Sequence, residues 1–510
     1  MRVVTEEQMR EIDRVAIHER GIPSLDLMER AGTACADVIT ELHAPKTAAV
    51  CAGKGNNAGD GFVVARLLSE RGVKVELFLS IPPEELRGDA LANFGRLPAG
   101  VKQTLDPEAE AFRLIGSEAD VIVDALLGTG VKGLVRGPMA EMIRRINEVE
   151  SSPVVAVDIP SGLSDENLAA GGECVHAGVT VTFGLPKRPM VIHPGAEFVG
   201  QLVVDDIGFP EDLLCDEALD LNLTVQGEVL DMLPERPEDS HKGTFGHLLI
   251  IAGSAGMGGA AAMTAQAAVR SGVGLVTVAV PRACLSCIET HVLSAVKRPL
   301  GSKSSDHLDE SALDQLGDLL DSVNAVVLGP GIGLAPKTKR LVHALLERVS
   351  VPLIIDADGL NALEGETDRL RRRHAPTILT PHPKEMSRLS GSEVQVIQSD
   401  RIAAARGFAS EIGVTLVLKG ARSVIADPGG DVWINPTGNT GLAKGGSGDV
   451  LTGLIGGLAA QGLPATQAAI AGVFWHGLAA DVALEQLPPQ VMVPDDVIGA
   501  LGEALRQLAE

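Results

Sequence analysis

Along the first part of the chain, short apolar runs alternate with segments of helical periodicity. The apolar runs are rich in Val, Ile and Ala and cover residues 48–51, 73–79, 121–127, 154–159 and 179–185. Nearly continuous apolar runs of this length predict buried strands of a parallel sheet that is covered on both faces. The intervening segments, such as 60–72 and 137–149, repeat apolar residues at helical spacing. The pattern therefore predicts a doubly wound α/β domain.

The alternation stops between residues 207 and 242, where the chain is acidic and carries Pro210, Pro234 and Pro237. Acidic segments interrupted by prolines are typical of domain boundaries. A chain of 510 residues is also too long for one compact core. We therefore expect two domains, residues 1–216 and 217–510.

The alternation resumes in the second part of the chain. Apolar runs that end in a polar or glycine-bearing turn cover residues 247–253, 274–280, 325–331, 352–359, 377–383 and 415–420. They predict a second α/β domain, in which helices dominate after Gly448. Residues 450–475 are uncharged, but Pro464 and several glycines interrupt them. Two buried helices joined by a turn are therefore a better interpretation than a membrane span.

Composition narrows the possible function classes. The chain has 43 Lys and Arg against 67 Asp and Glu, a net charge of −24, and 2% aromatic residues with no Tyr. Nucleic-acid binding needs a basic surface and stacking rings, so it is disfavoured. The first residues lack the apolar segment of a signal peptide, and six Cys make no disulfide framework, with Cys284 and Cys287 interpreted as ordinary buried thiols. We expect a soluble, cytoplasmic protein without nucleic-acid or membrane partners.

A glycine-rich turn follows the first predicted strand. Residues 53–61 read Gly-Lys-Gly-Asn-Asn-Ala-Gly-Asp-Gly and lead into a helix. Backbone N–H groups in such a turn, together with the positive end of the helix dipole, bind anions. A strongly acidic chain needs local donors of this kind to hold a phosphate. A tight capped turn is the alternative, but it does not require two adjacent Asn followed by Gly-Asp-Gly.

Two further predicted strands of the first domain end in acidic residues, Asp124 and Asp158. Ligands of an open parallel sheet lie beyond the carboxyl ends of its strands. Asn57, Asp124 and Ser161 would then converge as oxygen donors for a monovalent or hard cation. A partly desolvated Asp158 would act as a general acid or base. The alternative is that each Asp caps the following helix; three strand ends acting together favour the site.

Segments 53–68, 124–130, 157–163 and 182–187 (GKGNNAGDGFVVARLL, DALLGTG, VDIPSGL and TFGLPK) together resemble the YjeF N-terminal domain, the NAD(P)H-hydrate epimerase family. The resemblance implies a Rossmann-like domain that interconverts the R and S forms of NADHX and NADPHX, nicotinamide cofactors hydrated at C6. It also implies that the hydrate contacts Asn56, Asn57, Ala58, Gly59, Asp60, Gly128, Thr129, Gly130, Val131, Lys132, Gly133, Leu134 and Asp158, with Asp158 catalytic. By the same resemblance Asn57, Asp124 and Ser161 coordinate potassium. Ala58 departs from the family's Gly; its methyl is harmless at negative φ and crowds the phosphate at positive φ.

The strongest motif of the second half is residues 438–449, Gly-Asn-Thr-Gly-Leu-Ala-Lys-Gly-Gly-Ser-Gly-Asp, which leads into an apolar helix. The glycines expose consecutive N–H groups at the helix start, which favours anion binding. Asp449 both caps that helix and reaches an attacking hydroxyl, as phosphoryl transfer requires. Lys444 precedes the glycines, so this is not a Walker A loop. A purely structural cap is the disfavoured alternative.

Other strand ends supply further polar groups. His382 offers an imidazole for substrate contact, and Glu385 a carboxylate for magnesium, directly or through water. Gly331 lets a ligand approach the backbone, and the segment 419–423 carries donors for a nucleotide. The segment 356–359, Asp-Ala-Asp-Gly, fits a site wall and a capped turn equally well.

Segments 240–272, 328–333, 355–363, 379–385, 417–421 and 438–453 resemble the YjeF C-terminal domain, the ADP-dependent NAD(P)H-hydrate dehydratase family. The resemblance implies a ribokinase-like α/β domain in which ADP phosphorylates the C6 hydroxyl of the S hydrate, releasing AMP, after which phosphate leaves and NAD(P)H reforms. It implies hydrate contacts by Ala260, Gly331, His382 and the catalytic Asp449. It also implies nucleotide contacts by Lys419, Gly420, Ala421, Arg422, Ser423 and Gly448. Lys384 departs from the Gly of the family pattern; it either adds a phosphate contact or points outward.

Together these features predict a bifunctional repair enzyme with NADHX, NADPHX and ADP as small-molecule substrates and with potassium and magnesium ions as cofactors. We expect a homo-oligomer, for example a tetramer. Two alternatives stay open from the sequence. One is a ribokinase-like kinase that releases a stable phosphorylated product; the other makes the first domain a non-catalytic metabolite-binding module, as Ala58 would allow.

Overall fold

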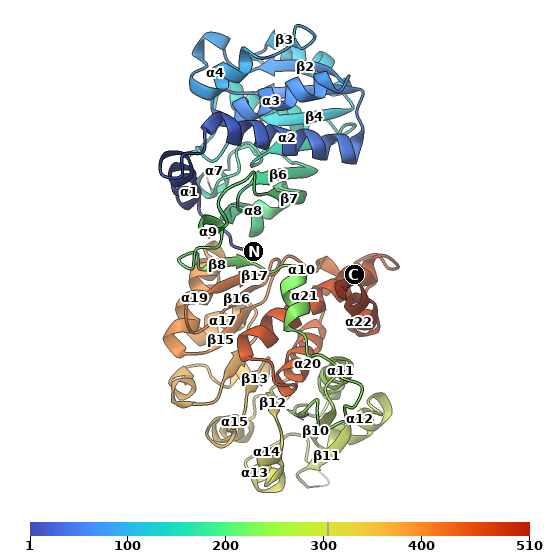
Figure 1. The fold of residues 1–510 in the computed structure, drawn as a ribbon. Coiled ribbons are helices and arrows are strands. Elements are labelled where there is room, and N and C mark those ends of the chain that lie inside the picture. Colours follow the sequence, from blue (N-terminus) through green and yellow to red (C-terminus); the bar gives the residue numbers. More distant parts are fainter. Residues whose placement is uncertain (170, 303–304, 510) are drawn as a thin grey trace. The chain divides into compact units, whose positions relative to one another are not determined.

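The computed structural model describes residues 1–169, 171–302 and 305–509 and divides the chain into two compact units, Met1–Leu219 and Asp220–Glu510 (Figure 1). Each unit contains its own sheet and its own hydrophobic core. The expected boundary at residues 216 and 217 lies close to this division. The α/β class predicted from the hydrophobic pattern is confirmed.

The first unit is built on a parallel sheet of seven strands in the order β3-β2-β1-β4-β5-β6-β7. The strands are β1 (Thr47–Ala52), β2 (Lys74–Leu79), β3 (Lys102–Leu105), β4 (Val121–Ala125), β5 (Val154–Val157), β6 (Val179–Phe183) and β7 (Gln201–Asp205). The helices are α1 (Glu6–His18), α2 (Ser24–His43), α3 (Asn56–Glu70), α4 (Gly88–Phe94), α5 (Glu110–Ile115), α6 (Pro138–Asn147), α7 (Asp165–Ala169), α8 (Arg188–Val191) and α9 (Glu211–Leu214). The order reverses between β1 and β4, which places a crevice at their carboxyl ends.

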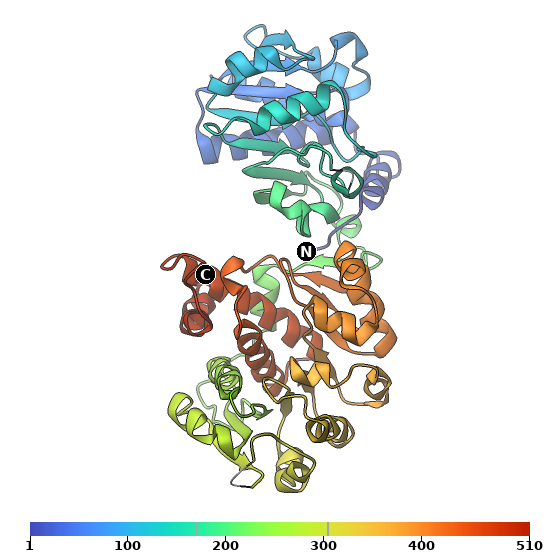
Figure 2. The same ribbon diagram turned by 180° about the vertical axis from the view of Figure 1, so that it is seen from behind.

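Helices cover both faces of this sheet, as the nearly continuous apolar strands require. On one face Val50 and Val123 pack against Phe62 of α3, and α2 and α3 lie over this face in Figure 1. On the other face Phe78 and Ile122 pack in the same cluster as Met142 of α6, the turquoise helix in front in Figure 2. The side chains alternate between the two cores, because successive residues of a strand point to opposite faces.

The second unit has a ten-stranded sheet in the order β11-β10-β9-β12-β13-β14-β15-β16-β17-β8. The strands are β8 (Leu221–Leu223), β9 (His247–Ile251), β10 (Leu275–Pro281), β11 (Val296–Leu300), β12 (Ala325–Leu328), β13 (Leu353–Ile355), β14 (Thr377–Leu379), β15 (Thr415–Leu418), β16 (Val424–Ala426) and β17 (Val432–Ile434). The pairs from β11 to β15 in this order and the pair β17–β8 are parallel, and the pairs β15–β16 and β16–β17 are antiparallel. A second order reversal lies between β9 and β12.

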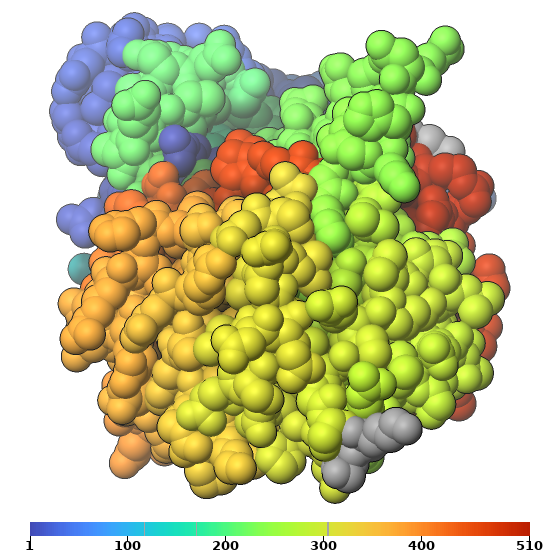
Figure 3. Space-filling view, turned by 90° about the horizontal axis from the view of Figure 1, so that it is seen from below, coloured from blue at the N-terminus to red at the C-terminus, as the bar shows by residue number. Residues whose placement is uncertain are grey.

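Thirteen α-helices surround this sheet in the described part of the second unit. They are α10 (Gln226–Met232), α11 (Gly258–Arg270), α12 (Leu285–His291), α13 (Ser311–Leu316), α14 (Leu319–Ser322), α15 (Pro336–Arg348), α16 (Asp358–Asn361), α17 (Pro383–Ser390), α18 (Val394–Ser399), α19 (Arg401–Ile412), α20 (Ser447–Ala460), α21 (Ala465–Leu484) and α22 (Pro494–Ala509). In the space-filling view of Figure 3, the segments from α12 (yellow-green) to α19 (orange) follow one another across one face of this unit.

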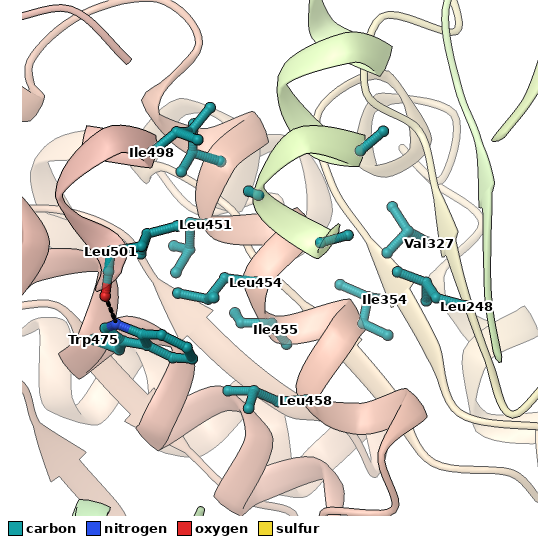
Figure 4. Packing of buried hydrophobic residues seen from close by; sticks show 14 of the residues in the cluster. Leu248, Val327, Ile354, Leu451, Leu454, Ile455, Leu458, Trp475, Ile498 and Leu501 are labelled. Carbon is teal, nitrogen blue, oxygen red and sulfur yellow. Dashed lines mark hydrogen bonds between the residues drawn. The ribbon is translucent and has the colours of Figure 1, made fainter. Parts of the chain in front are cut away.

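Helix α20 crosses the core of the second unit. Leu454 and Ile455 of this helix pack in one cluster with Val327 and Ile354 of the sheet (Figure 4). Trp475 of α21 lies in the same cluster and donates its indole N–H to the carbonyl of Leu501 at 2.9 Å. Helix α20 is thus anchored by its apolar length, which fixes the position of its N-terminal turn.

The uncharged stretch 450–475 forms the end of α20, a turn containing Pro464, and the start of α21, as predicted. Helix α21 is the one helix of the described residues that is long and apolar enough to cross a membrane, but 78% of its most apolar window is buried inside the unit. The helix therefore belongs to the core.

The hydrophobic pattern missed several strands at the edges and the antiparallel end of the sheets. Strands β3 and β7 lie at the two edges of the first sheet, and their residues are largely half-buried or exposed. Strand β8 lies inside the acidic segment that separates the predicted domains and pairs with β17. Short or exposed strands carry too few apolar residues to stand out.

Candidate active sites

The first candidate site lies at the order reversal of the first sheet. The turn after β1 leads into α3 at Asn56, and the turn after β4 begins with Leu126. A side chain at Gly53 would come within 2.1 Å of the Leu126 carbonyl oxygen, so only glycine allows these two turns to approach. The N-terminal N–H groups of α3 therefore face the crevice between the strands, where an anion is favoured.

Three oxygen-bearing side chains meet at this crevice. Asn57 donates its amide to the Leu127 carbonyl at 2.8 Å, while its Oδ1 is buried without a partner in the described structure. Asp124 is fully buried, and its carboxylate accepts from the backbone N–H and hydroxyl of Ser161 at 2.7 and 2.6 Å. Burial raises the pKa of Asp124 to about 6, against the lowering effect of those hydrogen bonds. One carboxylate, one free amide oxygen and one hydroxyl are donors that fit K⁺.

Asp158 follows β5 in an unusual backbone conformation, with a φ of +64°. Its Oδ1 lies 2.5 Å from Nζ of Lys187, which is 1% exposed. The same ammonium donates to the Thr182 hydroxyl at 2.9 Å and to the Phe183 carbonyl at 3.1 Å. Left-handed backbone at a non-glycine residue is costly and concentrates at functional sites. The lysine and the strained turn therefore hold the Asp158 carboxylate in one place.

Helix α1 lies against this site through two contacts. Val4, just before the helix, pairs with Lys187 in a parallel bridge. The N–H of Val4 donates to the Pro186 carbonyl at 3.0 Å, and the N–H of Arg188 donates to the Val4 carbonyl at 2.8 Å. Arg10 donates from Nη2 to the Thr129 carbonyl at 2.6 Å. Lys187 and Arg10 are site residues that the sequence interpretation did not single out, because both contacts join segments far apart in the chain.

Several carboxylates near Asp158 hold protons more tightly than usual. Burial raises the pKa of Glu6 to about 7 and that of Asp13 to about 6, and the charge of Asp158 adds to both shifts. Burial also raises the pKa of Asp60 well above its usual range, again with a contribution from Asp158. Groups that gain and lose protons near neutral pH suit acid–base catalysis.

Of the other contact residues predicted for the first unit, some lie beside this crevice and others are buried in the core. Gly128 lies against Asn57, since a side chain there would come within 3.3 Å of the Asn57 Cβ. The segment 128–134 is half-buried or exposed and so is accessible to a ligand. Ala58 lies inside α3, is fully buried in the core and has no positive φ. Its extra methyl therefore packs against the core and does not crowd the N–H groups at the start of α3.

The second candidate site lies at the carboxyl ends of β13, β14 and β15, beside the N-terminus of α20. Its centre is Lys419, whose Nζ donates to Asp356 Oδ1 at 2.8 Å and lies 3.9 Å from Glu385 Oε2. The second oxygen of Asp356 accepts from the hydroxyl of Thr452, one turn into α20, at 2.7 Å. Burial lowers the pKa of Lys419, but Asp356 and Glu385 together outweigh it and raise the pKa. Lys419 is therefore a fixed positive charge in this site.

Asp449 occupies the first turn of α20. Gly446 precedes the helix with a φ of +101°, a conformation that favours glycine. Burial raises the pKa of Asp449 to about 7; the charges of Asp356, Asp358 and Glu385 add to this, and Lys419 opposes it. A carboxylate with this pKa accepts a proton well near neutral pH.

His382 caps α17 with its ring. Its Nδ1 accepts from the backbone N–H groups of Lys384 and Glu385 at 3.1 and 3.3 Å, and the backbone N–H of His382 donates to Glu385 Oε2 at 2.9 Å. Nδ1 is therefore the acceptor, which leaves Nε2 as the ring donor, 3.5 Å from Glu385 Oε1. Lys384, which stands where the family pattern has Gly, has an exposed side chain that points outward.

The other residues predicted for the second site border the same region. A methyl group on Gly448 would lie 3.2 Å from Lys419 Nζ, and one on Gly331 would lie 3.1 Å from the Ala260 Cβ. Buried Arg401 donates to the carbonyls of Ala421 and Arg422 and so holds the turn of residues 420–423.

His476 of α21 was not singled out from the sequence. It is 6% exposed, and its Nε2 has no partner in the described structure. Burial and the charge of Lys419 lower its pKa to about 4. The ring is therefore a neutral polar group beside the lysine.

Magnesium fits the second site only together with a phosphorylated ligand. Among the described residues no three His, Cys, Asp or Glu side chains form a group that could hold a metal ion by themselves. Mg²⁺ usually takes one or two carboxylates, several waters and substrate phosphates. The nearly buried Glu385 carboxylate, with Asp356 and Asp449 near it, is suited to that partial role.

Comparisons with known proteins cover both units. The family described as NAD(P)H-hydrate dehydratase matches residues 248–501, and the YjeF-related protein N-terminus matches residues 24–189. The bifunctional NAD(P)H-hydrate repair enzyme Nnr of Moorella thermoacetica is 42% identical over 100% of this chain and 98% of its own. The enzyme of the same name from Thermofilum pendens is 38% identical over 100% and 97%. A ribokinase-like superfamily protein of Enterococcus faecalis, 25% identical, matches 57% of this chain and 96% of its own with a TM-score of 0.50.

Proposed function

The chain belongs to the family of bifunctional NAD(P)H-hydrate repair enzymes, and from that premise we propose that residues 1–216 epimerise NAD(P)HX and residues 217–510 dehydrate the S epimer with ADP. NADHX and NADPHX differ only by a ribose phosphate remote from the reacting ring, so both serve as substrates. The two activities suit one chain, because the dehydratase consumes one epimer and the epimerase replenishes it.

In the first site the hydrate lies beside Asp158, with its phosphates toward the N-terminus of α3. The C6 oxygen takes a proton and leaves as water, while the ring nitrogen supplies the electron pair and C6 becomes planar. Addition of water from the opposite face and loss of a proton then give the other epimer. Asp158 exchanges the proton, and the buried Lys187 fixes the position of its carboxylate. Contacts by residues 56–60 and 128–134 would orient the ring and the phosphates.

Potassium would be held by Asn57, Asp124 and Ser161. The buried Asp124 carboxylate has hydrogen-bond donors but no ion pair in the described structure, and the Asn57 Oδ1 is buried without a partner. When bound, K⁺ supplies a positive charge beside the helix terminus that binds the substrate phosphate.

In the second site the ionised Asp449 accepts the proton of the C6 hydroxyl. The hydroxyl oxygen then bonds to the terminal phosphorus of ADP, and the bond to the bridging oxygen breaks to release AMP. Next the C6–O bond breaks and inorganic phosphate leaves, driven by the ring nitrogen. Loss of a proton from C5 completes the reduced nicotinamide ring. Phosphate is a far better leaving group than hydroxide, which is why a nucleotide is consumed.

The chain's own residues bind and position both reactants of this step. Lys419 and the N-terminal N–H groups of α20 neutralise the transferred phosphoryl group, and His382 donates from Nε2 to the hydrate. The nucleotide would contact Lys419 to Ser423 and Gly448, and the hydrate would contact Ala260 and Gly331. Mg²⁺ bound with Glu385 would add charge neutralisation at the nucleotide phosphates.

The observation that carries this assignment is that each unit has a candidate site of its own, with different chemistry. The first lies at the order reversal of the first sheet, and the second lies at the carboxyl ends of β13, β14 and β15. One test uses separated R and S hydrates, ADP and Mg²⁺. We expect S hydrate to give reduced cofactor, AMP and phosphate in equal amounts, and R hydrate to be consumed faster than it epimerises spontaneously. A stable phosphorylated product would instead indicate a ribokinase-like kinase. We also propose a cytoplasmic homo-oligomer, for example a tetramer, which light scattering would test.

A further inference from the structure

The second site contains two residues, Asp356 and Thr452, that no step of the proposed reaction uses. Lys419 follows β15 and donates to one oxygen of Asp356, which follows β13, at 2.8 Å. The other oxygen of Asp356 accepts from Thr452 of α20 at 2.7 Å. Asp356 is 1% exposed and Thr452 is fully buried. Both carboxylate oxygens are therefore engaged, one with a cation and one with the helix.

These contacts tie Lys419 to the helix that carries Asp449. Gly448 and Asp449 lie at the N-terminus of α20, and a methyl group on Gly448 would come 3.2 Å from Lys419 Nζ and 3.7 Å from the Asp356 Oδ2. The ammonium thus lies directly beside the helix terminus where the transferred phosphoryl group would bind. A freely rotating lysine would spread its charge over several positions and lose part of that stabilisation.

The backbone between Asp356 and Asp358 is strained in a way that fits such a role. Ala357 has a φ of +52° and a ψ of −121°, an unfavourable conformation for a residue with a side chain. The aspartates on either side of Ala357 have different partners. Asp356 faces Lys419 and Thr452, whereas Asp358 accepts from the N–H of Gly333 at 3.0 Å.

We propose that Asp356 is a positioning residue: together with Thr452 it fixes the Lys419 ammonium beside the N-terminus of α20 and couples that charge to Asp449. The inference rests on the proposed dehydratase function, because it assigns Asp356 a role in that reaction. It resolves the choice that the sequence left open, between a site wall and a capped turn at residues 356–359.

The coupling has a consequence for pH dependence. The groups that act on Asp449 are Asp356 and Asp358 after β13, Glu385 on α17 and Lys419 after β15; His476 on α21 is neutral above pH 5 because its pKa is about 4. Removing the charge of Asp356 takes away a group that raises the pKa of Asp449. It also leaves Lys419 with only the more distant Glu385 carboxylate, at 3.9 Å, so that more of the lysine's charge acts on Asp449 and lowers that pKa further. Both changes move the pKa of Asp449 in the same direction, downward.

The test measures S-hydrate dehydration against ADP concentration from pH 5.5 to 9 for the wild type and for Asp356→Asn, in the full chain. Above pH 8, we expect Asp356→Asn to lower kcat/KM for ADP about a hundredfold through misplacement of Lys419. The deficit should shrink below pH 7, since the variant keeps Asp449 ionised at lower pH. A general loss of stability would lower activity without moving the acid limb.

Three further variants keep the result interpretable. Thr452→Val retains every charge and should raise the KM for ADP several-fold, whereas Thr452→Ser should restore it. Asp368→Asn makes the same chemical change at an exposed residue and should behave as the wild type. If Asp356→Asn does not fold, Thr452→Val decides, and an unchanged KM for ADP overturns the inference.

Failure of the inference and failure of the proposed function give different results. An Asp356→Asn enzyme with wild-type kcat/KM and an unmoved acid limb overturns the positioning role alone. A wild type that produces no reduced cofactor from S hydrate and ADP overturns the dehydratase assignment and the positioning role together.

Discussion

In the first unit Lys187 contacts Asp158 itself, the residue that we propose exchanges protons with the substrate, at 2.5 Å. In the second unit Lys419 contacts Asp356, while Asp449 forms no ion pair among the described residues and has its pKa raised to about 7. Both units thus pair a lysine with an aspartate beyond the carboxyl ends of parallel strands, with Lys187 1% exposed and the Lys419 side chain 20% exposed. They differ in whether the lysine holds the acid–base group or a neighbour of it.

The difference matches the two reactions. Epimerisation gives and takes back a proton within one cycle and transfers no phosphoryl group, so a fixed carboxylate with a cationic neighbour suffices. Phosphoryl transfer needs a base and a cation at separate places, one at the hydroxyl and one at the transferred phosphoryl group. A lysine paired directly with Asp449 would neutralise the base and withhold its charge from the phosphate.

The largest expected effect separates the two sites outright. Asp449→Asn should lower kcat for S-hydrate dehydration by about a thousandfold, because no other group is placed to accept the hydroxyl proton. The rate of epimerisation of R hydrate, measured by chiral chromatography, should be unchanged. Loss of both activities together would show that the units do not act independently.

Removing the lysine of the first unit tests its direct contact with the acid–base group. Lys187→Met leaves a partly buried Asp158 carboxylate without its cation, which should lower the epimerase rate by about a hundredfold and destabilise the first unit by about 3 kcal/mol. S-hydrate dehydration should be unchanged. Lys74→Met, at an exposed position on β2, is the matched control and should alter neither the rate nor the unfolding midpoint.

The pH profile of dehydration sharpens the contrast. Asp449 must be ionised to act as a base, and its pKa is raised to about 7, so kcat/KM should be full above pH 8 and fall below pH 7. One pH unit below that pKa the loss should be about tenfold. If kcat/KM fell only near the usual pKa of an aspartate, the raised pKa of Asp449 would be contradicted.

The sequence predicts site residues that belong to local motifs, but not contacts between segments that are far apart in the chain. The sequence predicts Asp124 and Asp158 as site residues because they end strands, and ligands of an open parallel sheet lie beyond the carboxyl ends of its strands. It predicts Asp449 because this residue follows a glycine-rich segment at the start of a helix. The strand at residues 221–223 was missed because three residues in an acidic segment carry no periodic signal.

The contacts of Lys187 and Lys419 show what sequence alone lacks. Lys187 meets Asp158 through the pairing of Val4 with residue 187 and the turn after β6, contacts that no local pattern encodes. The orientation of Asp356 toward Lys419 depends on the positive φ of Ala357 and on Thr452, almost a hundred residues along the chain. Only the assembled fold decides which way such side chains point.

Removing potassium should affect the first site only. Replacing K⁺ by choline should lower the epimerase rate several-fold, because the buried Asn57 Oδ1 and the buried Asp124 carboxylate would lose the cation proposed for them. Measuring S-hydrate dehydration in the same buffers checks selectivity. Equal loss of both activities would argue against a potassium site confined to Asn57, Asp124 and Ser161.

The smallest expected effect concerns α1. Arg10→Ala removes the contact between this helix and the Thr129 carbonyl and should raise the KM for R hydrate about two- to threefold. The change is small because an exposed contact of this kind contributes only about 0.5–1 kcal/mol. Steady-state kinetics with R hydrate would show it, and an unchanged KM would remove α1 from the site.

The central claim is that the two sites act in sequence, each with its own acid–base carboxylate. An equal mixture of R and S hydrates with ADP and Mg²⁺ is followed by the absorbance of the reduced cofactor, using the wild type, Asp158→Asn, Asp449→Asn and the two variants mixed. The wild type and the mixed variants should restore all the cofactor. Asp158→Asn should restore only the half that starts as S hydrate, after which restoration should slow to the rate of spontaneous epimerisation. Asp449→Asn should restore none. Full, rapid restoration by Asp158→Asn alone would contradict the account.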